Sequence, residues 1–195
     1  MSTDDRMRWD PQHLKSLGTE QPSAFLREIL ESDAGMGLGG TALDIACGKG
    51  RNAIYLAQRG FAVTALDISA VALAEGRQRA RQLDLLIDWH LCDLEAGELA
   101  PAGGDFDLII NFNYLQRSLI RPIRQAVKPG GHVIFETYLL DQAAVGHPKN
   151  PDYLLRHNEL LECFGDFRVL FYREGVFADG EAAAFRAAIF AQRIE

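Results

Sequence analysis

The chain has 195 residues and a formal net charge of −7, with 20 Lys and Arg against 27 Asp and Glu. This length favours one domain with a core large enough to need no disulfide or metal for stability. The acidic balance argues against binding nucleic acid through general electrostatics, because phosphate binding needs a basic face.

The first part of the chain is predicted to precede the main fold. Residues 1–22 are polar and aperiodic, and we interpret them as an N-terminal arm or cap before one domain over 23–195. An amphipathic helix is predicted over 23–31, with Ser23 as its N-cap and apolar side chains on one face. A glycine-rich run over 35–40 ends this helix.

From residue 41 onward, short apolar strands alternate with helices. The predicted strands are 41–46, 61–66, 86–91, 106–110 and 132–138. The predicted helices are 52–59, 70–83 with Ser69 as its cap, and 114–127, which Arg121-Pro122 can kink or restart. A tight turn over 128–131 precedes the fifth strand. Alternating helices and strands that are apolar throughout indicate a parallel sheet covered on both faces.

The chain after residue 138 has a different pattern. Residues 139–155 are predicted to form a long loop and residues 158–164 a short helix. Two further strands, 167–175 and 184–193, are joined by residues 176–183, a link too short for a crossover helix. The last two strands are therefore predicted to be antiparallel.

A glycine turn directly follows the first predicted strand, in the sequence Asp44-Ile45-Ala46-Cys47-Gly48-Lys49-Gly50. Glycine permits a sharp turn and the close approach of a ligand, and the helix that follows offers free N–H groups. Asp67 ends the second strand 19 residues after Gly48, a spacing that suits an acceptor for ribose hydroxyls. A helix cap or a solvated turn acid is the alternative role for Asp67.

Two further acids distinguish between the ligands that such a turn can bind. A dinucleotide would bring its pyrophosphate close to Asp44, whereas S-adenosylmethionine would bring a sulfonium and an ammonium group, which suit a buried acid. Asp93 follows the third strand and can reach an adenine amino group, with a plain loop acid as the alternative. Asp44 and Asp93 therefore favour the adenosyl ligand.

The residues around the turn, from Leu43 to Asn52, resemble motif I of the class I S-adenosylmethionine-dependent methyltransferases. Four later segments resemble the family's ribose-binding acid, adenine-binding segment, fourth strand and following turn: Asp67, Cys92-Asp93-Leu94, 106–111 and 128–131. Gly50-Arg51-Asn52, followed by Tyr55-Leu56-Ala57, is most similar to the tellurite-resistance branch and more distantly to the thiopurine methyltransferases.

This resemblance implies a Rossmann-like, doubly wound α/β fold. The family's sheet has seven mostly parallel strands in the order 3-2-1-4-5-7-6, with strand 7 antiparallel and helices on both faces. The resemblance also implies a cofactor site made of Asp44, Ala46, Cys47, Gly48, Gly50, Arg51, Asn52, Asp67, Ile68, Cys92, Asp93, Leu94 and Asn111. Ala46 stands where the family often has a second glycine, and we expect it to be tolerated with a small shift of the ligand's methionine end.

The residues that would act on the methyl acceptor stay open at the level of sequence. A thiolate or selenide needs positioning and a dry site, whereas a hydroxyl or amine also needs a base. Tyr114, Arg117 and Tyr138 are candidates for contacting the acceptor, with packing or surface charge as the alternative. His147 and His157 are candidates for the base, with a solvated loop residue as the alternative.

We therefore expect an S-adenosylmethionine-dependent methyltransferase acting on a small molecule, such as a thiol or a chalcogen oxyanion like tellurite or selenite. One alternative is a non-catalytic module that binds S-adenosylmethionine. The other is a nicotinamide-dependent dehydrogenase, which shares the glycines and Asp67 but leaves Asp44 and Asp93 unexplained.

Cysteine spacing and hydropathy indicate the setting of the protein. Three widely spaced cysteines without a C-x-x-C pair predict neither a disulfide framework nor a metal site. The start of the chain is polar, and no apolar run is long enough to span a bilayer. We expect a cytoplasmic protein that binds neither membranes nor nucleic acid, with an oligomeric state that the sequence leaves open.

Overall fold

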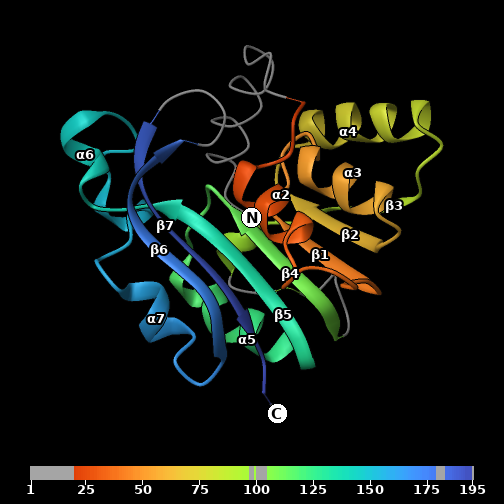
Figure 1. The fold of residues 1–195 in the computed structure, drawn as a ribbon. Helices are drawn as coiled ribbons and strands as arrows, with labels where there is room; N and C mark the ends of the chain where they lie inside the picture. Colours follow the sequence, from red (N-terminus) through yellow and green to blue (C-terminus); the bar gives the residue numbers. More distant parts are fainter. Residues whose placement is uncertain (1–19, 97–98, 100–104, 179–182, 195) are drawn as a thin grey trace.

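The computed structural model describes residues 20–96, 99, 105–178 and 183–194. In these residues a 7-stranded sheet has the order β3-β2-β1-β4-β5-β7-β6 (Figure 1). Its strands are β1 (Thr41–Ile45), β2 (Ala62–Asp67), β3 (Ile87–Leu91), β4 (Phe106–Phe112), β5 (Val127–Tyr138), β6 (Arg168–Ala178) and β7 (Ala183–Gln192). Strands β1 to β5 pair in parallel, and β7 runs antiparallel to both β5 and β6. The predicted fold class, strand order and antiparallel last pair are confirmed.

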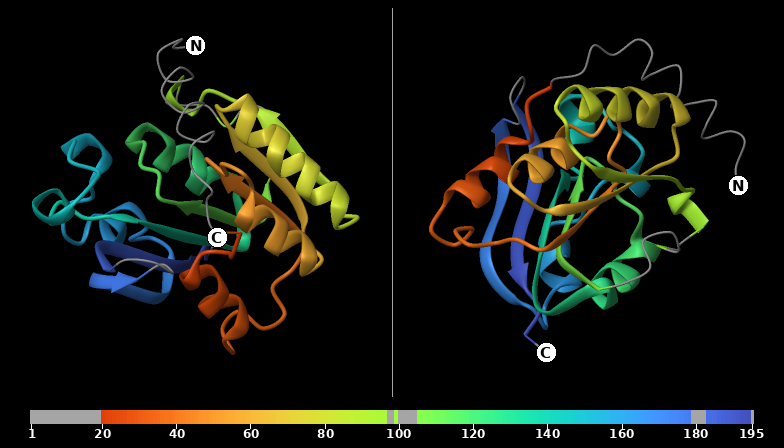
Figure 2. Two further views of the ribbon diagram at one scale, coloured as in Figure 1. Left: turned by 90° about the horizontal axis from the view of Figure 1, so that it is seen from above. Right: turned by 90° about the vertical axis from the view of Figure 1, so that its right-hand side faces the viewer.

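Helices cover both faces of the sheet (Figures 1 and 2). One face packs against α2 (Ala24–Glu31), α3 (Arg51–Gln58) and α4 (Ala70–Gln82), which share one cluster of buried apolar side chains with the strands. The other face packs against α5 (Ile120–Ala126) and α7 (Glu159–Cys163), which belong to a second cluster. A short helix, α6 (Gln142–Val145), follows β5. The two buried clusters are what the continuously apolar strands predict.

The two predicted serine caps have different roles in the structure. Ser69 is confirmed as the N-cap of α4, because its Oγ accepts the N–H of Ala72 at 3.1 Å. Ser23 stands at the N-cap position of α2, but its side chain makes no capping hydrogen bond there. Its hydroxyl instead accepts a hydrogen bond from Nη2 of Arg51 at 3.1 Å. The predicted N-cap position of Ser23 is therefore confirmed, but its hydroxyl bonds Arg51 and makes no capping hydrogen bond.

The helix predicted over 114–127 is shorter than expected. The structure has a single 3-10 turn, Arg117–Leu119, followed by α5. Pro122 is the third residue of α5, a position in the first turn where its missing N–H has no cost. If the helix began several residues earlier, the proline would lie in its interior and its ring would clash with a carbonyl. Proline therefore sets where this helix starts.

The segments around β5 and β7 also differ in detail from the prediction. Residues 128–131, predicted as a tight turn, form part of β5, and Gly130 has a φ of +79°. The end of β7 pairs there, since Gly130 N–H donates to Arg193 and Arg193 N–H donates to Gly131. The loop 139–155 contains α6 and a 3-10 turn, Pro151–Tyr153. Strands β6 and β7 extend further than predicted, so their link is residues 179–182, which lie outside the described residues, as does most of the predicted arm.

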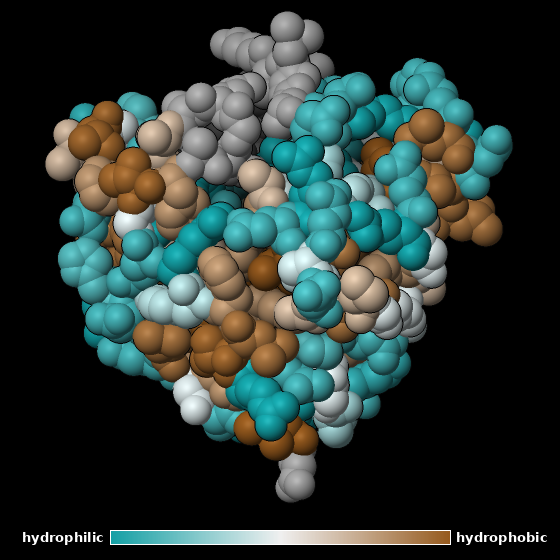
Figure 3. Space-filling view, viewed as in Figure 1, coloured by the Kyte–Doolittle hydropathy of each residue, from teal (hydrophilic) through white to brown (hydrophobic). Residues whose placement is uncertain are grey.

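The surface of the described residues is mixed in character. Figure 3 shows hydrophobic side chains in separate groups among hydrophilic ones. Several exposed apolar residues belong to the two outer strands, with Leu91 on β3 and Val169 and Val176 on β6. No helix in the described part of the chain combines the length and apolar character that a membrane crossing requires.

Candidate functional site

The carboxyl ends of β1, β2, β3 and β4 meet at one edge of the sheet. After β1, Cys47 N–H donates to the carbonyl of Leu66 at 2.9 Å, and after β3, Cys92 N–H donates to the carbonyl of Asp67 at 2.9 Å. Asn111 of β4 pairs in register with the last residue of β1. The structure therefore brings the predicted glycine turn, both strand-end segments and Asn111 together, at the edge where open α/β sheets bind ligands.

The backbone of the glycine turn is left-handed at three positions. Gly48 and Gly50 have φ angles of +56° and +74°, and Ala46 has a φ of +53°. A residue with a Cβ is strained in this region by about 1 kcal/mol or slightly more. A glycine would adopt this conformation without strain, and Ala46 adopts it at that cost.

Trp89 of β3 packs directly against the turn. A Cβ added at Gly50 would lie 2.2 Å from Cη2 of Trp89, and one added at Gly76 of α4 would lie 2.7 Å from the same atom. An ion pair of 2.6 Å between Lys49 and Glu75 adds a second link between the turn and α4. Gly50 is therefore required by packing as well as by backbone conformation.

Asp44 is buried inside β1, with 1% of its surface exposed. Its Oδ2 atom has no hydrogen-bond partner among the described residues. Burial, followed by the nearby carboxylate of Asp67, raises the pKa of Asp44 to about 8, although Ala53 N–H and Arg51 act in the opposite direction. The free protein thus contains an unsatisfied buried acid that a cationic or N–H-bearing ligand group would stabilise.

Asp67 is also buried, at the end of β2. Its Oδ2 accepts the N–H of Gly48 at 2.7 Å, and its Oδ1 accepts the N–H of Ser69 at 2.8 Å. Each carboxylate oxygen can accept more than one hydrogen bond, so a bond to the turn does not by itself exclude a bond to a ligand hydroxyl. Asp67 can therefore hold the turn and bind a ribose at the same time.

The residues that follow β2 and β3 form the next part of this edge, with Ile68 directly after Asp67. Asp93 is half-buried, and its Oδ1 accepts the N–H of Glu95 at 3.1 Å at the start of a 3-10 turn, Leu94–Ala96. Leu94 is buried in the second apolar cluster, and Cys92 packs against it. The structure thus places an acid beside an apolar wall, as an adenine site needs.

Cys47 lies inside the turn, and its thiol is not poised for chemistry. Burial, followed by the charges of Asp44 and Asp67, raises the pKa of Cys47 well above its ordinary value. A thiol with a raised pKa is a poor nucleophile, because the thiolate is the reactive form. The geometry therefore supports the interpretation of Cys47 as a packing residue.

Arg51 and Asn52 connect the turn to the segment before α2. Asn52 Oδ1 accepts the N–H of Ser23 at 2.8 Å. Arg51 donates to the Ser23 hydroxyl and, from Nη1, to the carbonyl of Gln21 at 3.3 Å. These two residues fix the chain before α2 at the start of α3, next to the turn.

The candidates after β4 have different surroundings. Asn111 is buried, and its Nδ2 donates to the carbonyl of Tyr114 at 2.7 Å, so its amide shapes the turn after β4. Arg117 donates from Nε and Nη2 to the two carboxylate oxygens of Glu159, at 2.7 and 3.0 Å. It also donates to the carbonyls of Asp152 and Leu154. Arg117 is thus engaged in holding the segment 152–159.

Both candidate histidines lie on the segment between β5 and α7. His147 is exposed, and its carbonyl accepts a hydrogen bond from Gln142 at 3.1 Å. Nε2 of His157 lies 2.6 Å from Oδ2 of Asp141, and this carboxylate raises the pKa of the imidazole. Neither imidazole is hydrogen-bonded in the structure to the described residues of the glycine turn or to Asn111.

A buried polar cluster at the end of β5 was missed by the sequence reasoning. Glu136 and Arg186 have exposed fractions of 1% and 5%. Nη1 of Arg186 donates to Asn113 at 2.6 Å and to Glu136 at 3.3 Å, and Nη2 donates to the hydroxyl of Tyr138 at 3.0 Å. The available signal was a charged residue within an apolar stretch of each strand, because such charges are costly to bury unless paired.

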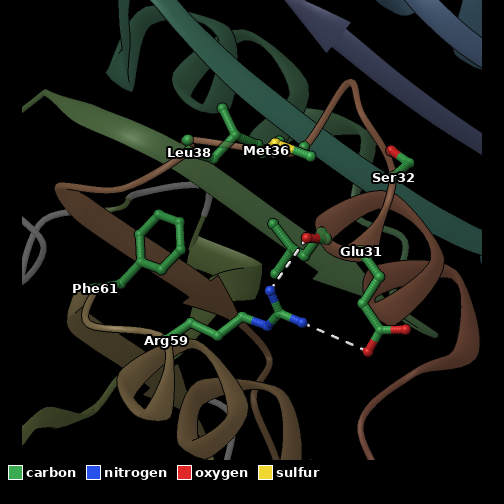
Figure 4. A pocket seen from close by; sticks show the side chains of 9 residues that line it. Glu31, Ser32, Met36, Leu38, Arg59 and Phe61 are labelled. Carbon is green, nitrogen blue, oxygen red and sulfur yellow. Dashed lines mark hydrogen bonds and ion pairs between the residues drawn. The ribbon is translucent and has the colours of Figure 1, made fainter.

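A pocket of about 390 Å³ lies at the other edge of the sheet, near the amino ends of β1 and β2. Its lining comes from the end of α2, the 35–38 loop, Arg59 and Phe61 (Figure 4). Arg59 donates to the carbonyl of Leu30 at 3.1 Å and reaches Glu31 at 3.5 Å. None of the predicted cofactor residues lines this pocket, so it is separate from the candidate site.

Comparisons with known proteins find that this chain is similar to methyltransferases. Residues 42–131 match a family model described as a methyltransferase domain. The ubiquinone biosynthesis O-methyltransferase of Acinetobacter baumannii (strain AYE) is 30% identical over 137 residues, which are 67% of this chain and 57% of that protein. The chain therefore spans little more than half the length of the curated relatives it matches.

Two solved structures show the same fold at low identity. TehB from Haemophilus influenzae superposes with a TM-score of 0.77 at 21% identity, covering 94% of this chain and 66% of TehB. The magnesium protoporphyrin IX methyltransferase of Synechocystis PCC 6803, crystallised with S-adenosylmethionine, gives a TM-score of 0.69 at 19% identity, covering 98% and 96% of the two chains. At these identities, both similarities establish a shared fold.

Proposed function

We propose that this chain is a class I S-adenosylmethionine-dependent methyltransferase that binds S-adenosylmethionine at the carboxyl edge of its sheet and transfers the methyl group to a small molecule. The observation that carries the proposal is Asp44, a fully buried acid next to the glycine turn with an oxygen that finds no partner among the described residues. A phosphate-bearing cofactor would add negative charge beside it, whereas the ammonium of S-adenosylmethionine would satisfy it. We also propose that residues 23–195 act as one domain, with 1–22 as its arm.

The residues present fit such a cofactor along its whole length. We assign the ribose hydroxyls to Asp67, the adenine amino group to Asp93 and the amino-acid end to Asp44 and the left-handed turn. The remaining predicted contacts of the cofactor are Ala46, Cys47, Gly48, Gly50, Arg51, Asn52, Ile68, Cys92, Leu94 and Asn111. S-adenosylmethionine supplies a methyl group on a positively charged sulfur that is already activated for displacement. The chain's own task is to orient the acceptor and exclude water.

The acceptor we favour is a thiol or a chalcogen oxyanion. Such a nucleophile presents a lone pair with little or no help from a base, whereas a hydroxyl needs its proton removed. His157 is engaged with Asp141, and His147 is exposed, so neither imidazole stands ready as a base beside the turn. The similarity to ubiquinone biosynthesis O-methyltransferases favours a phenolic hydroxyl as a second candidate acceptor.

Two measurements test this proposal in sequence. Calorimetric titration with S-adenosylhomocysteine should show micromolar binding, and its absence in folded protein at millimolar ligand would refute the cofactor assignment. Transfer of labelled methyl from S-adenosylmethionine to thiols, tellurite, selenite and small phenols then identifies the acceptor. Binding of S-adenosylhomocysteine without transfer to any member of the panel would favour a non-catalytic module. Binding of NADH in its place would favour the dehydrogenase.

A further inference from the structure

The cluster around Arg186 lies at the carboxyl ends of β4 and β5, beside the proposed cofactor site. Asn113 directly follows β4, and its N–H donates to the carbonyl of Glu136 at 2.9 Å. Arg186 of β7 pairs in register with Tyr138, the last residue of β5. We infer that the Arg186 guanidinium binds an anionic oxygen group of the methyl acceptor, an inference that rests on the proposed function.

The guanidinium of Arg186 is held in one orientation by two residues of β5 and by the residue that follows β4. Its hydrogen bonds to Asn113, Glu136 and Tyr138 all leave from Nη1 and Nη2, and its carbon centre lies 4.2 Å from the Tyr138 ring centroid. The Nε atom is buried and has no partner among the described residues. Since buried N–H donors are normally hydrogen-bonded, this donor calls for an oxygen that the described residues do not provide.

Arg186 shares its carboxylate partner with a second arginine. Glu136 faces two guanidinium groups, that of Arg186 at 3.3 Å and that of Arg173 at 3.7 Å. Arg173 also pairs with Glu28 at 2.9 Å, so the four charged side chains balance overall. Arg186 is the more buried of the two arginines, with 6% of its side chain exposed against 28% for Arg173. An anionic acceptor would give this buried guanidinium an oxygen partner that it does not share.

Guanidinium chemistry limits the class of group that is recognised. The planar fork of arginine matches two oxygens that are bonded to the same atom and share one negative charge. A buried pair between a guanidinium and such an anion is stronger than a neutral hydrogen bond. A carboxylate carried by a small thiol has this chemistry, and so does a free oxyanion. Tyr138 and Asn113 act as positioning residues, because they orient the guanidinium that makes the contact.

Titration of protein loaded with S-adenosylhomocysteine tests the inference. The probes are 3-mercaptopropionate, its neutral counterpart 3-mercaptopropanol, and selenite. We expect at least one anion to bind about tenfold more tightly than the neutral thiol. Arg186→Gln should weaken the binding of that anion about tenfold. The neutral thiol should bind both proteins equally. Arg168→Gln, at an exposed arginine of β6, is the matched control and should change nothing.

The outcomes separate this inference from the proposed function. Affinity for S-adenosylhomocysteine reports the cofactor site alone, and if that ligand does not bind, the same anion titration is run on the free protein. A charge-balanced variant, Glu136→Gln with Arg186→Gln, takes the place of Arg186→Gln if the single variant fails to fold. Equal binding of anion and neutral thiol, or anion binding unchanged by loss of Arg186, overturns the inference. Preference for selenite over 3-mercaptopropionate identifies the free oxyanion as the source of the group.

Discussion

The N–H of Gly48 lies 2.7 Å from Oδ2 of Asp67, so the glycine turn after β1 is tied to the end of β2 by a single carboxylate. The same side chain holds the N–H of Ser69 through its other oxygen. Asp67 therefore shapes the turn before any ligand arrives, and its carboxylate is held in a fixed direction.

Replacing Asp67 by Ala should weaken the binding of S-adenosylhomocysteine by at least about tenfold, because a buried acceptor for two hydroxyls is lost. Isothermal titration calorimetry measures this change. Asp88→Ala is the control, since Asp88 is an exposed acid on the neighbouring strand β3. Unchanged affinity in Asp67→Ala would refute the assignment of the ribose to this carboxylate.

Gly50 and Gly60 form a matched pair for testing the contact with Trp89. Both have left-handed φ angles, +74° and +87°, but a Cβ at Gly60 meets nothing within 4 Å. Gly60→Ala should therefore cost about 1 kcal/mol of unfolding free energy from backbone strain alone. Gly50→Ala should cost at least about 2 kcal/mol, since overpacking against Trp89 is added to the strain. Urea denaturation checks both values. Equal losses of unfolding free energy in the two variants would show that the Trp89 side chain moves to make room for the added methyl group.

The buried acid Asp44 should make the free protein less stable as the pH rises. Its folded-state pKa of about 8 lies above its ordinary value of 3.8, so the folded state holds this proton more tightly than the unfolded state. The contribution of Asp44 to stability therefore falls between pH 4 and 8, by about 1.4 kcal/mol per pH unit at most, and levels off above the folded pKa.

Asp44→Asn should remove that slope, because an amide does not titrate. The difference in unfolding free energy between this variant and the unaltered protein, measured from pH 5 to 9, isolates the effect from other titrating groups. Asp33→Asn, at an exposed acid in the loop after α2, serves as the reference. A difference that stays constant with pH would mean that Asp44 is already ionised in the folded protein.

Arg117 should prove more important for stability than for the chemical step. Its partner Glu159 is 5% exposed at the side chain, and the guanidinium also holds two carbonyls. Arg117→Ala should cost about 2 kcal/mol of unfolding free energy, because a buried carboxylate loses a two-pronged partner. Arg156→Ala, at an arginine that is 62% exposed, should cost less than about 1 kcal/mol.

Methyl transfer by Arg117→Ala, measured well below its melting temperature, separates the structural role from a catalytic one. We expect activity within a few-fold of the unaltered protein. A loss of several orders of magnitude with the stability unchanged would restore Arg117 as a catalytic candidate.

Local pattern was enough to predict the strands, the parallel sheet and the antiparallel last pair, whereas the order of the strands came from the resemblance to a known family. The apolar strands ending at Asp67 and Asn111 follow from hydropathy alone, and parallel pairing brings their carboxyl ends together. The cluster around Arg186 could not be placed from the sequence, because its partners Asn113 and Glu136 are 73 and 50 residues away. Such contacts depend on the order and register of the strands, which no local pattern contains.

The antiparallel direction of β7 separates the two ends of the described chain. Gln21 and Ser23 are hydrogen-bonded to Arg51 beside the glycine turn. Arg193 pairs with Gly131 near the amino end of β5, at the opposite edge of the sheet (Figure 1). A fluorophore or surface anchor attached after residue 194 would therefore leave the carboxyl edge of the sheet, with its glycine turn, uncovered. Because Gln21 and Ser23 lie beside the glycine turn, a biosensor made from this protein should be immobilised through its carboxyl end.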